Sequence, residues 1–237
     1  MKQRGVHLLP DDAPLTSSIA DTVGALIAQG HGAWDWGHGN DLLESDDILA
    51  QNPAAYRLGL EPVLLDIAED YLSEPCFYMG CSLKRERVSP SNAGTRQWHH
   101  DIEDDRMLRL IFYLNPVQEG GGPFQYIDAA RSRAAHAALG YRSGYLSDAA
   151  MQPAVPCDDW VSVQGAAGMM IAFDGTRVFH RATRPLADDR FSLSITYSSR
   201  YPRQILRQVR LRTASRRKLV ASLTERQRAC LPRGRWN

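Results

Sequence analysis

The chain has 237 residues, of which 43% are hydrophobic and 23% charged, and its formal net charge at pH 7 is +1. It holds no run of about eighteen apolar residues, which argues against a membrane span. Its four cysteines show no paired spacing, which argues against a zinc site. The first residues lack a basic-then-apolar signal, so we expect a cytoplasmic protein.

The first third of the chain carries two helical patterns. Apolar residues recur at helical spacing over residues 15 to 30, where Gly30 offers a stop, and a second helix is expected from about Pro62 to Leu72. Between them, residues 31 to 57 hold tryptophans and histidines among glycines and acids. We favour a lid or substrate loop for this segment, with an irregular covering segment as the alternative.

The rest of the chain up to about residue 200 is typical of β-strands joined by turns. Gly120-Gly121-Gly122 marks a tight turn, and residues 129 to 139 are rich in alanine and prone to helix. The predicted strands are Cys76 to Lys84, Leu108 to Leu114, Met169 to Phe173, a segment that ends at His180, and Phe191 to Tyr197.

Three residues suggest a metal centre. Side chains at positions i and i+2 of a strand share a face, so His99 and Asp101 can hold one ion, and His180 can join them from a second strand. Two imidazoles and one carboxylate form the facial triad that binds non-haem Fe(II) and leaves three coordination positions open. This set points to an oxygen-activating enzyme.

The last predicted strand supplies a candidate anion site. Apolar and hydroxyl side chains alternate along it, so Arg190 and Ser192 are expected on its polar face. A guanidinium with a hydroxyl two residues on can bind the far carboxylate of a dicarboxylate whose other end chelates the metal. The natural co-substrate for this arrangement is 2-oxoglutarate.

The order of these motifs resembles the phytanoyl-CoA dioxygenase-like branch of the Fe(II)/2-oxoglutarate oxygenases, over about residues 76 to 200. The resemblance rests on Gln97-Trp98-His99-His100-Asp101, on Leu108 to Leu114, on Gly122 to Ile127, and on Phe173-Asp174-Gly175 to His180 with Arg190. Members often carry a Pro-Gly-Ser-His element after the Gly-Pro segment. This chain has Asp128-Ala129-Ala130-Arg131-Ser132 there instead.

The resemblance implies a mainly β fold with flanking helices, a double-stranded β-helix (jelly-roll, cupin-like) barrel. It implies iron held by His99, Asp101 and His180, with 2-oxoglutarate anchored by Arg190 and helped by Ser192. The expected reaction consumes O2 and 2-oxoglutarate, releases succinate and CO2, and hydroxylates an unactivated C–H bond of a small molecule. No catalytic residue beyond the iron centre is expected. Related halogenases lack the carboxylate ligand, so Asp101 favours hydroxylation, while desaturation or ring closure stay open.

The domain organisation follows from this resemblance. We expect one domain over residues 1–237, with a helical cover at about 1–75, the barrel at about 76–200 and a basic helical tail at about 201–237. Each motif alone has a plainer interpretation: His180 as a core histidine, Arg190 as a surface cation, Ser192 as a strand hydroxyl. The joint occurrence of the motifs in this order favours the oxygenase.

Charge is unevenly distributed along the chain. From Arg200 to Asn237 there are twelve basic residues and one acid, Glu225. Such a tail could contact nucleic acid or a carrier. We favour a helix that packs inward through residues such as Leu206, Val209, Leu219, Val220 and Leu223, because the tail has few aromatics for base stacking. A nucleic-acid- or carrier-associated oxygenase and a non-catalytic binding barrel remain the alternatives.

Overall fold

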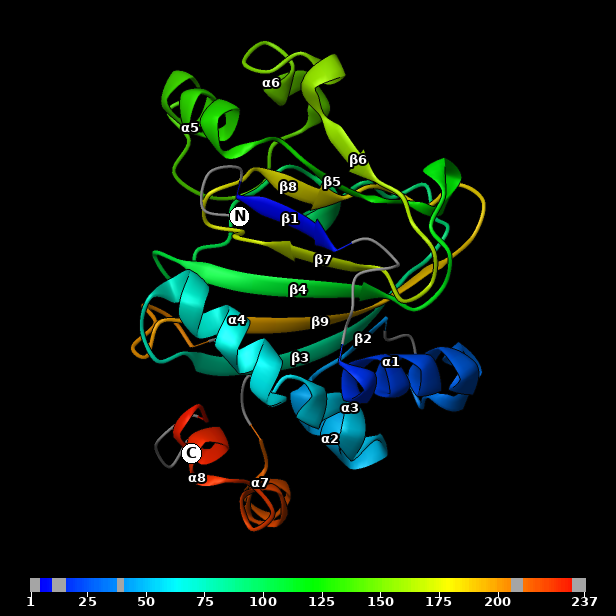
Figure 1. Cartoon of the computed structure of the whole chain (residues 1–237). Coiled ribbons are helices and arrows are strands. Elements are labelled where there is room, and N and C mark those ends of the chain that lie inside the picture. Colours follow the sequence, from blue (N-terminus) through cyan, green and yellow to red (C-terminus); the bar gives the residue numbers. More distant parts are fainter. Residues whose placement is uncertain (1–4, 10–15, 38–40, 206–210, 232–237) are drawn as a thin grey trace.

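The computed structural model describes residues 5–9, 16–37, 41–205 and 211–231. Within them the strands form two antiparallel sheets (Figure 1). The larger sheet has the order β1 (Val6–Leu9), β7 (Met170–Phe173), β4 (Met107–Tyr113), β9 (Arg190–Ser198), β3 (Phe77–Glu86) and β2 (Leu42–Leu43). The smaller sheet has the order β6 (Val161–Val163), β5 (Phe124–Tyr126) and β8 (His180–Ala182). The predicted mainly β fold with flanking helices is confirmed.

Helices flank the two sheets. Helices were predicted at three places where the structure has α1, α4 and α5, and Gly30, with a φ of 70°, follows α1 as the predicted stop. The helices are α1 (Ser17–Gln29), α2 (Ser45–Gln51), α3 (Pro53–Leu58), α4 (Pro62–Leu72), α5 (Ala129–Ala138), α6 (Asp148–Met151), α7 (Thr213–Val220) and α8 (Glu225–Ala229). Single 3-10 turns are η1 (His31–Ala33), η2 (Gly94–Arg96), η3 (Glu119–Gly121) and η4 (Cys157–Asp159).

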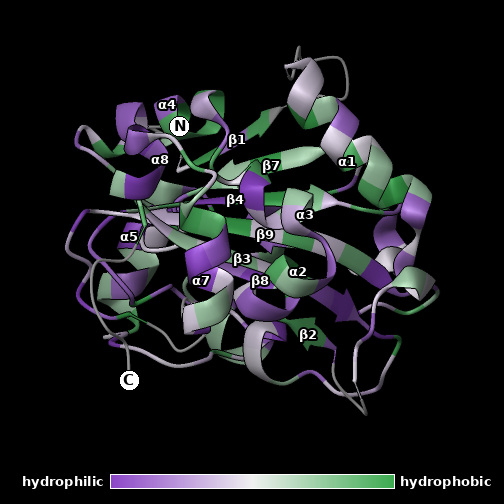
Figure 2. Cartoon of the chain, turned by 90° about the horizontal axis from the view of Figure 1, so that it is seen from below, coloured by the Kyte–Doolittle hydropathy of each residue, from purple (hydrophilic) through white to green (hydrophobic). Residues whose placement is uncertain are grey.

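The outer face of the larger sheet packs against α1 to α4. Leu108, Leu110 and Phe112 alternate along β4 and are fully buried in the cluster that these helices complete. Seen from below, α1 shows green and purple residues along its length, as expected of a helix with one face in the core (Figure 2). Burial of this apolar face fixes which way every inner side chain of the sheet points.

The inner face of β3 and β9 is polar, as the alternation of residues 190 to 197 predicted. In the antiparallel register Lys84 lies opposite Ser192 and Glu86 opposite Arg190, while Leu83 and Leu193 point outward into the core. Because side chains of a strand alternate between faces, these polar residues converge on the interior of the barrel.

Three local predictions need correction. The strand that was expected to end at His180 instead begins there as β8, and residues 175–177 form a turn. Residues 97–101 do not form a strand. In this segment only Trp98 and His99 form isolated bridges. Asp101 follows them in a loop, and its own N–H donates to the Gly175 carbonyl. The segment pairs with β8 at one residue only, so it does not form a continuous strand there. Residues 45–57, predicted as part of a lid or an irregular covering segment, instead fold into the covering helix α2 and most of α3.

The described part of the basic tail contains the short helices α7 and α8. Leu219 and Leu223 are buried in the main core cluster and Val220 packs against it, whereas Leu206 and Val209 lie outside the described residues. None of the helices in the described part of the chain is both long and apolar enough to cross a membrane.

Candidate active site

His99, Asp101 and His180 converge in the barrel interior. One ligand atom of each lies within 4.8 Å of the others, and His180 Nε2 is 3.7 Å from Asp101 Oδ1. The two histidines are direct cross-strand partners, with ring centroids 4.3 Å apart. The backbone therefore brings together two imidazoles that are far apart in the sequence.

Each histidine is oriented by a carbonyl of its own segment. His99 Nδ1 lies 2.9 Å from the Gln97 oxygen, and His180 Nδ1 lies 3.1 Å from the Val178 oxygen. Because a carbonyl only accepts, each Nδ1 carries the proton and each Nε2 keeps its lone pair. Burial lowers the pKa of both imidazoles, that of His180 to about 3, where repulsion from His99 adds to the effect. Both rings are neutral, as a metal requires.

Asp101 completes the donor set with a charged oxygen. Burial alone would raise its pKa, but Arg109 and the histidines outweigh it and lower the pKa. Asp101 Oδ2 is buried without a hydrogen bond, 3.1 Å from an Arg109 nitrogen. A Cβ on Gly175 would lie 1.9 Å from this oxygen, so only glycine fits beside the carboxylate. Two neutral imidazoles and an ionised carboxylate fit a divalent metal ion.

One cavity of about 250 Å³ is lined by both candidate histidines and by the candidate anion residues. His99, His180, Arg109, Arg190 and Ser192 line it, and Asp101 lies beside His180 without lining it. Arg190 and Ser192 are 5% and 4% exposed, so their polar groups face the cavity and not bulk solvent. The interpretation of Arg190 as a surface cation is therefore wrong.

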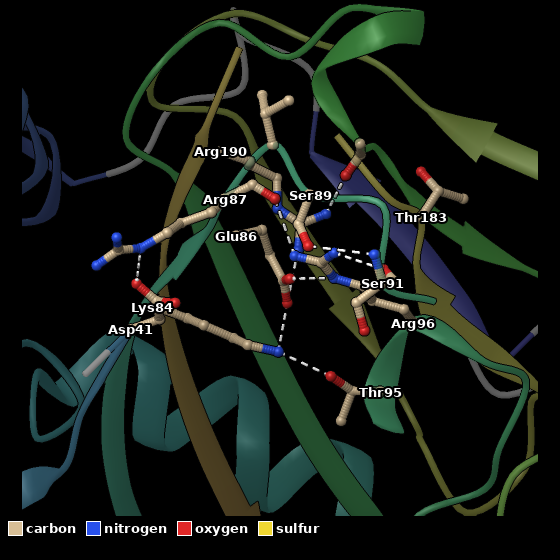
Figure 3. Close-up of polar contacts among 12 residues, drawn as sticks. Asp41, Lys84, Glu86, Arg87, Ser89, Ser91, Thr95, Arg96, Thr183 and Arg190 are labelled. Atoms are coloured by element: carbon tan, nitrogen blue, oxygen red, sulfur yellow. Dashed lines mark hydrogen bonds and ion pairs between the residues drawn. The ribbon is translucent and has the colours of Figure 1, made fainter. Parts of the chain in front are cut away.

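Arg190 belongs to a cluster of cations around one carboxylate (Figure 3). Its NH1 donates to the Gly122 carbonyl, and its NH2 lies 3.8 Å from Glu86 Oε1. Lys84 contacts the same carboxylate and donates to Thr95 Oγ1 at 2.7 Å. Arg96 donates to Glu86 Oε2 at 3.0 Å. The part of the cavity wall that Lys84 and Arg190 form is thus strongly cationic.

Other residues near the site lie either in the core or in the cavity wall. Trp98 and Tyr113 are fully buried in core clusters. The Tyr113 hydroxyl donates to the Val163 carbonyl, so it packs and does not line the cavity. Trp34 and Trp36 pack around Phe191 on the outer side of β9. Ser82 and Lys84 do line the cavity.

Two charged residues of the site were missed in the sequence. Arg109 is the one cation in the apolar run of β4, and that isolation was a signal that could have marked it as inward-facing. Glu86 lies beyond the predicted end of its strand at Lys84, although it continues the same alternation. Both point into the barrel because β4 and β3 pair with β9 on either side.

A second group of possible metal ligands exists among the described residues. Glu69, Cys76 and Cys230 lie together away from the cavity, with the two sulfurs 4.0 Å apart. Glu69 already binds Arg226, and the cysteines are free thiols. This group joins α8 to α4 and β3 and takes no part in the cavity.

The fold is shared with several solved structures. EctD from S. alaskensis with bound Fe aligns at a TM-score of 0.57 and 18% identity, over 84% of this chain and 74% of that one. HygX from Streptomyces hygroscopicus with nickel, 2-oxoglutarate and hygromycin B aligns at 0.56 and 14%, over 83% and 84%. The epimerase SnoN in complex with Fe3+, alpha ketoglutarate and nogalamycin RO aligns at 0.54 and 17%, over 83% and 79%.

These comparisons confirm the double-stranded β-helix (jelly-roll) fold. No protein-family model and no curated protein sequence matches the chain. At identities below 20% the likeness concerns the fold, while the chemistry of this chain rests on its own residues. EctD was crystallised with Fe, HygX with nickel and 2-oxoglutarate, and SnoN with Fe3+ and alpha ketoglutarate, and the His99, Asp101 and His180 site could bind such a metal.

Proposed function

We propose that this protein is an Fe(II)- and 2-oxoglutarate-dependent dioxygenase that hydroxylates an unactivated C–H bond of a small molecule. It would release succinate and CO2, and O2 would be the second co-substrate. The sequence motifs support a place in the phytanoyl-CoA dioxygenase-like branch. The presence of Asp101 supports hydroxylation, because a carboxylate fills the position that a halide would take.

One observation carries the proposal: a single cavity is lined by the two histidines of a two-histidine, one-carboxylate donor set and by a buried arginine with a neighbouring hydroxyl. A dicarboxylate fits this layout, because its distal carboxylate can accept from Arg190 and Ser192 while its 2-oxo acid end reaches the metal. Bound Fe(II) would supply the activation of O2. The chain would supply the ligands, the orientation of the diacid and the exclusion of water.

Small-molecule substrates are supported by the size of the cavity and by the neighbours, which hold hygromycin B and nogalamycin RO. The basic tail fits this view. Arg212 and Arg226 bind acids of the body, Asp46 at 2.9 Å and Asp66 and Glu69 at 2.6 and 2.7 Å. These tail cations thus neutralise the acidic body within one molecule, which favours a small-molecule enzyme over one that docks on nucleic acid.

The test is anaerobic titration of the apoprotein with Fe(II) and then 2-oxoglutarate. The weak visible charge-transfer band of the chelate should appear in the parent chain and be lost in Asp101→Ala. No band from folded parent protein would overturn the proposal in favour of a non-catalytic barrel. Succinate release would then be used to screen small molecules.

A further inference from the structure

Glu86 is a buried carboxylate surrounded by three cations. It is 3% exposed, and Lys84, Arg96 and Arg190 all point toward it (Figure 3). A charge is buried in proteins only when it is paired. Here one carboxylate pairs with three cations, so the four side chains together carry a surplus of two positive charges.

Glu86 contacts the candidate co-substrate anchor but does not line the cavity. Lys84 and Arg190 line the cavity together with Ser192 and Thr95, whereas Glu86 does not. Its position follows from the register, because Glu86 is the cross-strand partner of Arg190 and shares a strand face with Lys84. The carboxylate therefore contacts both anchor cations without itself lining the cavity that they line.

The pairing between Glu86 and Arg190 is loose. The 3.8 Å separation is an ion pair without a hydrogen bond, and Arg190 Nε has no hydrogen-bond partner in the part of the chain that the structure describes, while Glu86 Oε1 contacts Lys84 Nζ. Arg96, in contrast, uses its donors within the protein: it donates to Glu86, to the Ser91 carbonyl and to the Arg87 carbonyl. Arg190 keeps donors available for a ligand.

The charge on Glu86 is secure. Burial alone would raise its pKa, but attraction from Lys84 and Arg190 outweighs burial and lowers the pKa. An anion in the cavity that binds the same two cations would then feel a fixed negative charge a few ångströms behind them. Repulsion at this range is several-fold stronger in a protein interior than in water.

We infer that Glu86 sets the affinity of the co-substrate site. It holds Lys84 and Arg190 in place and weakens their pull on the distal carboxylate, so that succinate, which keeps that carboxylate, can exchange for fresh 2-oxoglutarate. The inference rests on the proposed function, and it makes Glu86 a positioning residue that acts through Arg190 and Lys84.

The test is Glu86→Gln, which keeps the shape of the side chain and removes its charge. The anaerobic Fe(II) protein should bind 2-oxoglutarate, followed by the visible band, and succinate, followed by calorimetry, about tenfold more tightly than the parent chain. A merely structural role would weaken binding or leave it unchanged. Asp41→Asn is the matched control, because it removes an exposed carboxylate from Arg87, the residue after Glu86, outside the cavity lining, and should change neither affinity.

A charge cycle covers the case in which Glu86→Gln alone does not fold. Lys84→Met should weaken diacid binding, and Lys84→Met with Glu86→Gln, which restores the surplus of two charges, should bind more tightly than Lys84→Met. The inference is overturned if Glu86→Gln binds the diacids no more tightly than the parent chain, or if the double variant binds them no more tightly than Lys84→Met. Absence of 2-oxoglutarate binding in the parent chain would instead overturn the proposed function, and with it this role for Glu86.

Discussion

The backbones of His99 and His180 pair directly, each N–H donating to the carbonyl oxygen of the other at 3.1 Å. This bridge joins the loop that carries Asp101 to β8, and it sets the distance between the two imidazoles. The metal centre is thus held by main-chain hydrogen bonds, so each ligand can be removed without removing the bridge.

Removal of a ligand should abolish metal binding and spare the fold. His99→Ala, Asp101→Ala and His180→Ala are each expected to lower Fe(II) affinity by more than about 100-fold, because each removes one of three protein donors. Calorimetric titration under anaerobic conditions, with circular dichroism as a check of folding, measures this. His136→Ala removes an exposed histidine of α5 and should bind iron normally. Unchanged iron affinity in any of the three ligand variants would exclude that residue from the centre.

Gly175 should be needed for its lack of a side chain. In Gly175→Ala the new methyl would lie 1.9 Å from Asp101 Oδ2 and displace the carboxylate, so Fe(II) affinity should fall by about tenfold while Asp101 is still present. Gly24→Ala is the control, since a Cβ there meets nothing within 4 Å. If Gly175→Ala binds iron as the parent chain does, the carboxylate is not confined by this contact.

Arg190→Ala should separate co-substrate binding from metal binding. It removes a buried charged donor from the cavity, which should raise the 2-oxoglutarate dissociation constant by about 10- to 100-fold while Fe(II) still binds. The anaerobic band titration provides both values. Arg184→Ala, which removes an exposed arginine bound to the Pro90 carbonyl, serves as the control. An unchanged 2-oxoglutarate affinity would move the anchor to another cation.

Much of this site could be predicted because local patterns encode it. Alternation of apolar and hydroxyl residues in β9 is enough to put Arg190 and Ser192 on one face of the strand. The apolar residues of the other face pack outward into the core, so the face with Arg190 and Ser192 points into the barrel. The contribution of Arg109 and Glu86 could not be predicted in the same way. It depends on the register of β4 and β3 against β9, which no single strand encodes.

The immediate surroundings of Asp101 show the same limit. A strand would have explained the i, i+2 spacing of His99 and Asp101, yet the structure has one bridge and a loop. What holds Asp101 is the Gly175 carbonyl, from a turn distant in the sequence. The spacing therefore indicated the correct residues for a reason that is only partly correct.

The lowered pKa of Glu86 predicts a specific acid sensitivity. The pKa in the folded state lies below the usual value of 4.5, so the unfolded chain binds more protons, and the contribution of Glu86 to stability is present above pH 4.5 and lost as pH falls through the folded pKa. Glu86→Gln should therefore be less stable than the parent chain at neutral pH, with a difference that shrinks toward acid. Urea unfolding across this range measures it. A difference that stays constant with pH would show that the charge of Glu86 does not stabilise the fold.

The basic tail should be held by its apolar side chains more than by its charges. Arg226 binds Asp66 and Glu69, but all three side chains are partly exposed, and pairs of this kind contribute about 0–1 kcal/mol. Leu219 is 2% exposed in the main core, and its truncation costs about 2–5 kcal/mol. In chemical denaturation, Leu219→Ala should thus lower the free energy of unfolding well beyond Arg226→Ala. The reverse order would mean that ion pairs, and not burial, attach the tail to the barrel.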